Sequence, residues 1–166
     1  ITDMGKIQMV DLKGQYKKIK NQIDTVVIQT IESTSFINGP EVKEFSNSLA
    51  DYLDVKHVIP CANGTDALQI ALMALSLKPG DEVISTNDLY GGSYRLFDKI
   101  FKDFGIKFHF IPMDKISLIK SLITSKTKLI WVETPTNPMI NIIDIELISN
   151  ISRSNEILLA VDNTFA

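Results

Sequence analysis

The sequence of 166 residues contains a single cysteine, Cys61, and only two histidines. One cysteine excludes an internal disulfide framework. The histidines, His57 and His109, lie far apart in the sequence, which argues against a zinc site built on them. No long basic run is present and the formal net charge is −3, so nucleic-acid binding has no electrostatic support.

Long apolar runs are also absent. No stretch approaches the ~20 residues that a membrane span needs, and the first residues lack the pattern of a signal peptide. Hydrophobic residues make up 45% of the chain and charged residues 22%, which is ordinary for a globular domain with a substantial core. We therefore expect a soluble, cytoplasmic protein without membrane or nucleic-acid partners.

Helical and extended patterns alternate along the chain. The expected helices cover residues 15–33, 41–53, 65–75, 94–104, 116–123 and 144–154. The expected strands cover residues 57–61, 82–86, 106–111, 128–133 and 157–162. Strands separated by helices favour right-handed crossovers and a mostly parallel sheet. The predicted fold class is therefore α/β, with three αβα layers.

The last predicted strand ends in a carboxylate, Asp162. Ligands of open α/β sheets bind at the carboxyl ends of the strands, so Asp162 is placed where a ligand is expected. Two more segments follow strands in the same way. Tyr90 precedes two glycines and could stack on a flat ligand or pack on the surface. Asn137 stands in a proline-rich loop, which either presents it in a fixed pose or is an ordinary rigid turn.

A further candidate is the helix start at Gly64 and Thr65. Free amide groups and the helix dipole favour a phosphate there, and Gly64 allows a close approach of the backbone. From these residues alone a plain capped helix start is the simpler interpretation. No Gly-Lys-Ser/Thr follows, so this is not a Walker motif.

At these segments the sequence resembles a known family. Residues 88–97 (DLYGGSYRLF), 131–138 (WVETPTNP) and 160–166 (AVDNTFA) look like the Cys/Met-metabolism family, the group of cystathionine γ-synthase and γ-lyase, which use pyridoxal phosphate (PLP). This resemblance covers about residues 80–166. It implies an amino-acid substrate, a homo-oligomer and the aspartate-aminotransferase-like fold.

The first half resembles a different family of the same fold. Residues 7–16 (IQMVDLKGQY), 36–42 (FINGPEV) and 62–72 (ANGTDALQIAL) look like the DegT/DnrJ/EryC1/StrS sugar aminotransferases, over about residues 7–83. That family implies an amino-sugar substrate. We therefore interpret the chain as a chimeric fragment, with an N-terminal arm and helix in residues 1–40 and part of a PLP-binding large domain in residues 41–166.

The resemblance implies a role for each candidate residue. Gly64 and Thr65 would meet the PLP phosphate, Tyr90 would stack on the pyridine ring, and Asp162 would pair with the pyridine nitrogen. Asn137 would contact the cofactor's phenolic oxygen or the substrate carboxylate. Arg95 is a candidate for a distal substrate carboxylate, although a solvated surface arginine is as good an interpretation.

Both families hold PLP as a Schiff base on a lysine that follows the Asp162 strand, and no lysine of this sequence matches that motif. We therefore expect no catalytic residue in the chain and no turnover by the chain alone, as a fragment of a transsulfuration enzyme. A sugar aminotransferase fragment is one alternative. A non-catalytic phosphate- or nucleotide-binding α/β module, which would not need Asp162, is another.

Overall fold

The computed structural model describes residues 10–166, which fall into two compact units divided between Pro60 and Cys61. The first nine residues of the predicted N-terminal arm lie outside the described residues, as does the start of the 7–16 motif. The domain boundary predicted at residue 40 falls inside the first unit. None of the helices in the described part of the chain is long and apolar enough to cross a membrane.

The first unit consists of two helices, α1 (Leu12–Ser33) and α2 (Pro40–Leu53). Both begin slightly earlier than the apolar spacing predicts. The side chain of Asp11 accepts a hydrogen bond from the Gly14 N–H (2.8 Å), and this N-cap extends α1 by one turn. Pro40 occupies the first turn of α2, where its missing N–H costs nothing.

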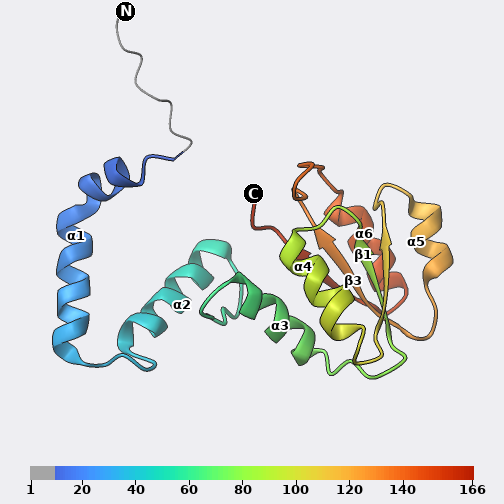
Figure 1. The fold of residues 1–166 in the computed structure, drawn as a ribbon, viewed down its shortest axis with the longest axis horizontal. Helices are drawn as coiled ribbons and strands as arrows, with labels where there is room; N and C mark the ends of the chain where they lie inside the picture. The colour runs from blue at the N-terminus through green and yellow to red at the C-terminus, as the bar shows by residue number, and fades with distance from the viewer. Residues whose placement is uncertain (1–9) are drawn as a thin grey trace, which may run out of the picture. The chain divides into compact units, whose positions relative to one another are not determined.

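The second unit is built on a sheet of four parallel strands (Figure 1). Its strands are β1 (Glu82–Thr86), β2 (Lys107–Ile111), β3 (Thr127–Glu133) and β4 (Leu158–Asp162). The strand order is β2-β1-β3-β4, so β1 and β3 are central. Every residue of β1 is buried, as expected of a parallel strand covered on both faces. The four described strands match the predicted ranges to within one residue at either end.

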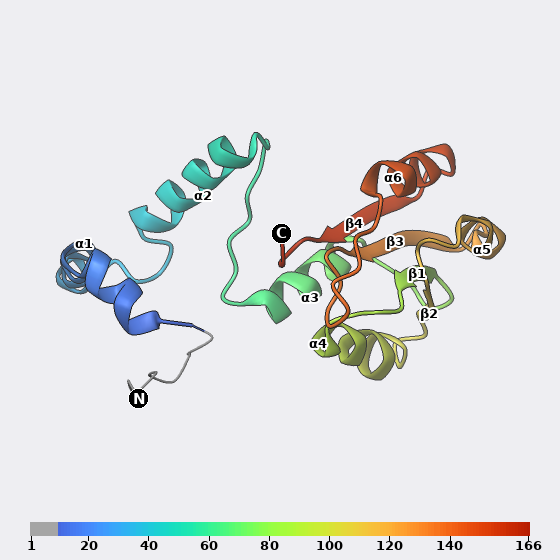
Figure 2. The same ribbon diagram turned by 90° about the horizontal axis from the view of Figure 1, so that it is seen from above.

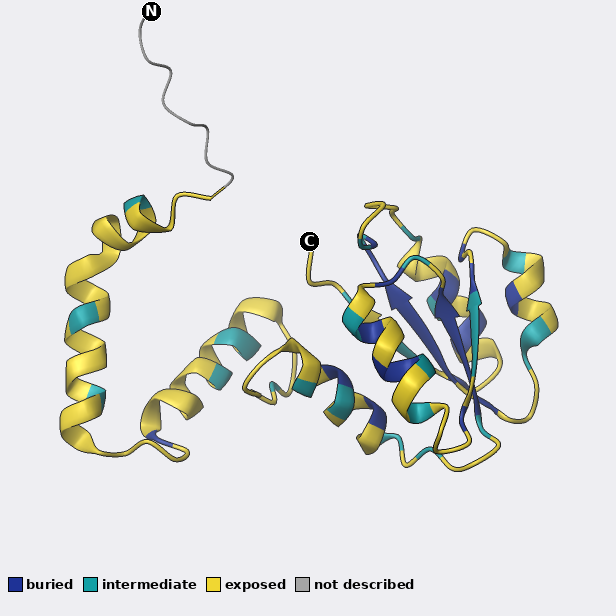
Figure 3. Cartoon of the chain, in the orientation of Figure 1, coloured by how far each residue is buried: buried dark blue, intermediate teal, exposed yellow. Residues whose placement is uncertain are grey.

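Helices cover both faces of this sheet, which gives the predicted three layers (Figure 2). On one face lie α3 (Gly64–Ala74), α4 (Gly91–Arg95) and a π-helical segment, η1 (Leu96–Phe101), with a core that includes Leu72, Phe97 and Trp131. On the other face lie α5 (Ile116–Leu122) and α6 (Ile145–Ser154), with a core that includes Ile119, Ile130 and Ile148. The buried residues concentrate in the strands and in the sheet-facing sides of these helices (Figure 3).

Two local predictions need correction. Residues 57–61 are not a strand: Ile59 is 76% exposed, and Pro60 has no N–H to donate to a ladder. The helix predicted for 94–104 begins three residues earlier, because Gly91 and Gly92 form its first turn instead of a separate tight turn. Its end is correct in outline, since Gly105 adopts a left-handed φ of 81° just after the helical segment.

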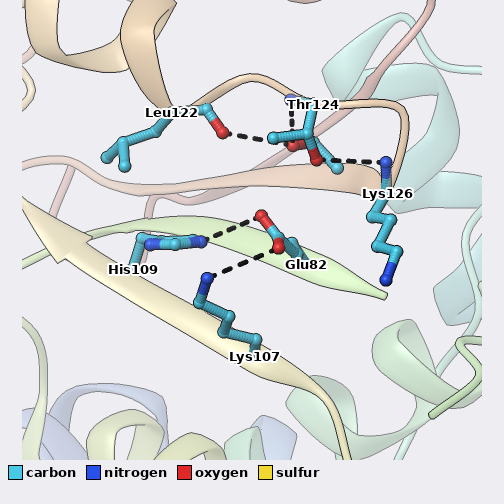
Figure 4. A network of polar contacts seen from close by, with 7 residues as sticks. Glu82, Lys107, His109, Leu122, Thr124 and Lys126 are labelled. Atoms are coloured by element: carbon cyan, nitrogen blue, oxygen red, sulfur yellow. Dashed lines mark hydrogen bonds and ion pairs between the residues drawn. The ribbon is translucent and has the colours of Figure 1, made fainter. Parts of the chain in front are cut away.

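At the amino ends of β1 and β2, away from the ligand edge, Glu82 forms a polar cluster (Figure 4). Its carboxylate contacts the Nε2 of His109 at 3.0 Å and the Nζ of Lys107 at 3.5 Å. The hydrogen bond with His109, and then the charge of Lys107, hold the pKa of Glu82 below its usual value. The Lys126 N–H donates to the Oγ1 of Thr124 (3.1 Å) in the turn beside this cluster.

Candidate functional site

A cavity of about 670 Å³ opens at the carboxyl edge of the sheet, within the second unit. This volume lies in the range of small-molecule sites. The cavity lies on the face of the sheet that carries α3 and α4, and Trp131 and Ala160 belong to its wall. Its lining includes all five residues that the sequence predicts for the cofactor: Gly64, Thr65, Tyr90, Asn137 and Asp162.

The start of α3 offers free backbone donors to this cavity. The side chain of Asn63 caps the helix by accepting from the Asp66 N–H (3.0 Å), and its carbonyl accepts from the Ala67 N–H (3.1 Å). The N–H groups of Gly64 and Thr65 have no acceptor within residues 10–166. A Cβ added at Gly64 would meet no atom within 4 Å, so the backbone is open there. This end of the helix is therefore suited to an anion such as a phosphate.

Tyr90 stands at the cavity as the residue that caps α4, and 47% of it is exposed. Its ring lies directly over Gly92, because a Cβ added at Gly92 would come within 2.3 Å of the Tyr90 Cε1. The ring position therefore depends on the absence of a side chain at residue 92. An aromatic ring held in this way at a cavity can stack on a flat ligand.

Two carboxylates lie side by side in the cavity wall. Glu133 and Asp162 are partners in the register between β3 and β4, at the carboxyl ends of both strands. The Oδ1 of Asp162 accepts a hydrogen bond from the Thr164 N–H (3.1 Å). Glu133 is only 4% exposed, and both of its oxygens accept from the Tyr90 N–H (3.1 and 3.0 Å). Burial, followed by the charge of Asp162, raises the pKa of Glu133 above its usual value.

Glu133 is part of the 131–138 motif, but the sequence alone predicts no role for it. Strand periodicity contained a usable signal, because Leu129, Trp131 and Glu133 alternate onto one face of β3. The indole Nε1 of Trp131 is buried in the cavity wall and has no hydrogen-bond partner among the described residues. A buried acid and an unpaired buried donor therefore join the predicted residues at this site.

The half-buried Asn137 lies in a loop that Asp88 holds in place. The Oδ2 of Asp88 accepts hydrogen bonds from the Thr136 hydroxyl (2.5 Å), the Met139 N–H (3.2 Å) and the Asn141 side-chain amide (3.3 Å). These contacts lie on both sides of Asn137 in the sequence. They give the loop a fixed path past the cavity.

Arg95 is the one predicted site residue that the structure does not place at the cavity. It ends α4, is exposed, and is absent from the lining. No lysine is among the lining residues of the described chain, and residues 10–166 contain no group of three or more side chains suited to a metal ion. The role proposed for Arg95 in substrate binding stays a prediction.

The donor set of the cavity fits PLP. Free amides at a helix start suit its phosphate, an aromatic ring suits its pyridine plane, and a carboxylate suits a protonated ring nitrogen. Fold and cavity together define an α/β protein with a site for a flat, anionic ligand. The model of the family "Cys/Met metabolism PLP-dependent enzyme" matches residues 20–166, and the chain belongs to this family, whose cofactor is PLP.

Individual relatives agree with this assignment. The chain is 42% identical over 105 residues to a cystathionine gamma-synthase of Mycobacterium leprae, a match that covers 63% of this chain and 27% of that protein. It is 37% identical over 127 residues to a cystathionine gamma-lyase of Dictyostelium discoideum, covering 76% and 32%. The chain thus spans about a third or less of the length of these two relatives.

Solved structures show the same fold. A Campylobacter jejuni protein assigned as an O-acetylhomoserine (thiol)-lyase, solved with N′-pyridoxyl-lysine-5′-monophosphate, superposes with a TM-score of 0.71 at 32% identity, over 78% of this chain and 32% of that chain. A cystathionine gamma-lyase from Lactobacillus plantarum in complex with L-serine gives a TM-score of 0.59 at 38% identity, over 63% and 27%. The aspartate-aminotransferase-like α/β fold predicted from the sequence is confirmed.

The comparisons also bear on the interpretation of the chain as a chimera of two families. The family match begins at residue 20, so it includes most of the segment that resembles the sugar aminotransferases. The comparisons give no support to a sugar aminotransferase segment or to a fusion of two proteins. The Cys/Met family accounts for both halves of the described chain from residue 20 onward.

Proposed function

We propose that this chain forms the cofactor-binding part of a PLP enzyme of sulfur amino acid metabolism, of the cystathionine γ-synthase or γ-lyase type. The observation that carries the proposal is the convergence of Gly64, Thr65, Tyr90, Asn137 and Asp162 on one cavity. The names of the relatives support the reaction class, since they act as synthases and lyases of cystathionine. The substrate is accordingly a sulfur-containing or related amino acid.

Each lining residue has a role in this proposal. The amides of Gly64 and Thr65 bind the phosphate, and Tyr90 covers one face of the pyridine ring. Asp162 keeps the ring nitrogen protonated by placing a negative charge beside it. Asn137 contacts the phenolic oxygen of the cofactor or the substrate carboxylate. When bound, PLP supplies an electron-accepting ring for chemistry at the substrate's α-carbon.

We further propose that residues 1–166 alone bind PLP without covalent attachment and without turnover. No lysine of the described residues lines the cavity, whereas PLP enzymes use a lysine to hold the cofactor and to transfer protons. Borohydride reduction of the PLP complex followed by peptide mass spectrometry should then find no pyridoxyl-modified lysine. A single modified lysine, together with release of a keto acid from cystathionine, would contradict this.

Binding itself can be measured with the only tryptophan of the chain, Trp131, which lies in the cavity wall. PLP titrated into the chain should quench this fluorescence in a saturable way. Asp162→Asn should weaken PLP affinity by about tenfold or more, because the ring nitrogen loses its counter-charge. The exposed Asp103→Asn serves as the control and should bind like the wild type.

The same titration separates the alternatives. A phosphate- or nucleotide-binding module would bind ADP as well as PLP and would not respond to Asp162→Asn. A sugar aminotransferase would need a keto-sugar nucleotide, and Tyr90 with its two following glycines favours the Cys/Met family instead. Equal affinity of wild type and Asp162→Asn for PLP would therefore overturn the proposed function.

We also propose that the protein is a homo-oligomer. The helix α1 has no buried residue within the described chain, and its apolar side chains Val26, Val27 and Ile31 are each more than half exposed. Such a helix is typical of an intersubunit contact. Sedimentation velocity should show a species larger than a monomer, and Val27→Glu should shift it toward the monomer.

A further inference from the structure

Glu133 is a buried carboxylate that the proposed roles leave unexplained. It is 4% exposed and forms no ion pair with any described lysine, arginine or histidine. Two further acids, Asp162 and Asp88, lie near enough to raise its pKa. A buried charge without a cation is unfavourable for folding, so a residue of this kind at a cavity is a candidate for a functional role.

The contacts of Glu133 connect the two loops that carry the site. Both of its oxygens accept from the Tyr90 N–H, at 3.1 and 3.0 Å. The backbone N–H of Asn137 lies near enough to this carboxylate to favour its charged form and lower its pKa. One side chain on the rigid strand β3 therefore binds the backbone of Tyr90 and lies near that of Asn137, and these two residues line the cavity from different loops.

The position of the Tyr90 ring depends on this anchor. Gly92 leaves room for the ring, which lies against its backbone. The hydroxyl of Tyr90 forms no hydrogen bond with any of residues 10–166, and almost half of the residue is exposed. The backbone N–H of Tyr90 donates to the carboxylate of Glu133. These hydrogen bonds fix where α4 begins and therefore where the Tyr90 ring projects.

We propose that Glu133 is a positioning residue of the cofactor site, which holds Tyr90 so that its ring lies over the plane of a bound pyridine. The inference rests on the proposed function, since it assumes that PLP occupies this cavity. Glu133 acts through the backbone of Tyr90, and it needs no contact with the substrate. The ionised carboxylate presents two acceptor oxygens and no donor to this N–H group, whereas an amide side chain presents one of each.

The test compares Glu133→Gln with the wild-type chain in PLP binding. Glutamine keeps the size of the side chain but replaces one of the two acceptors by an NH₂ group, so only its Oε1 can accept from the Tyr90 N–H and the charge is lost. We expect about tenfold weaker PLP affinity by Trp131 fluorescence. We also expect a smaller induced circular dichroism signal of the bound cofactor, because the ring over it is no longer fixed. Glu146→Gln, at an exposed glutamate of α6, is the matched control.

A second variant and a measurement without ligand complete the test. Glu133→Asp keeps the charge but withdraws it by one methylene, so we expect an affinity between those of Glu133→Gln and the wild type. In the absence of PLP, hydrogen–deuterium exchange of the Tyr90 amide should be faster in Glu133→Gln than in the wild type. A merely structural role would instead lower the urea midpoint and leave the cofactor signal of the folded fraction unchanged.

The outcomes separate this inference from the proposed function. If the wild type binds PLP and Glu133→Gln binds with the same affinity and the same circular dichroism, the inference is overturned and the proposed function stands. If the wild type does not bind PLP, both are overturned. Faster exchange at Tyr90 combined with weaker binding and a reduced signal supports the inference.

Discussion

Two buried glutamates, Glu82 and Glu133, show how the environment of a single residue decides its contribution to the stability of the fold. Glu82 has partners that favour its charge, His109 first and Lys107 next, and its pKa lies below the usual value. Glu133 is buried and lies near other acids, and its pKa lies above the usual value. The two residues should therefore give the stability of the protein opposite dependences on pH.

For Glu133 the pKa in the folded chain exceeds that in the unfolded chain. The folded state thus binds more protons between the two values, and stability is lost as pH rises from the ordinary glutamate range through the raised pKa. Glu133→Gln removes this loss. Urea unfolding over a pH series should show that the variant gains stability relative to the wild type as pH rises through this window. A constant difference across the series would contradict the prediction.

For Glu82 the sign is reversed. Its lowered pKa means that stability is present above the ordinary glutamate pKa and is lost as pH falls through the folded value. Glu82→Gln should lower the urea midpoint near neutral pH and have a smaller effect in acid, where the wild type has already lost the charge. PLP affinity should not change in the folded fraction, because Glu82 lies at the opposite ends of the strands from the cavity.

Gly91 and Gly92 form a matched pair at the start of α4. A Cβ at Gly92 would lie 2.3 Å from the Tyr90 ring, whereas a Cβ at Gly91 would meet only the Arg95 guanidinium at an ordinary 3.6 Å. Gly92→Ala should therefore displace the ring and weaken PLP binding by about tenfold, and Gly91→Ala should leave it unchanged. Equal affinities of the two variants, measured by Trp131 fluorescence, would be inconsistent with a fixed ring.

At the scale of elements, the site depends on loops held between rigid strands. Asp88 follows β1 and binds the loop after β3 through Thr136, Met139 and Asn141. Asp88→Ala removes an acceptor from three donors at once, and we expect a loss of about 1–3 kcal/mol in the free energy of unfolding. Urea denaturation measures this loss. Asp114→Ala, at an exposed aspartate after β2, is the control and should be close to neutral.

The elements could be predicted from the sequence to different extents. The four strands and the helices α3 and α6 follow from apolar periodicity, and α6 also from its cap Asp144, because these signals are local. The strand predicted for 57–61 is wrong, since an apolar run does not form a strand without a hydrogen-bonding neighbour. The hydrogen bonds from Tyr90 to Glu133 could not be predicted, because they join residues 43 positions apart.

At the scale of the molecule, the cavity joins the start of α3 to the end of β4 across the whole second unit. PLP should therefore stabilise the unit as a whole by mass action. At a free concentration of 100 times Kd the expected gain is about 2.7 kcal/mol. Thermal unfolding at increasing PLP should show a rising Tm in the wild type and a smaller rise in Asp162→Asn at the same concentrations.

The position of β4 in the sequence sets the order in which the parts of this cavity are synthesised. During synthesis Gly64 and Thr65 leave the ribosome long before Asp162, which stands at the end of the edge strand next to β3. A nascent chain that has formed α3 and the first three strands still lacks the carboxylate proposed to bind the pyridine nitrogen. On the proposed function, tight capture of PLP has to wait until β4 has paired with β3. Cofactor uptake would then distinguish chains in which β4 has paired with β3 from chains in which it has not.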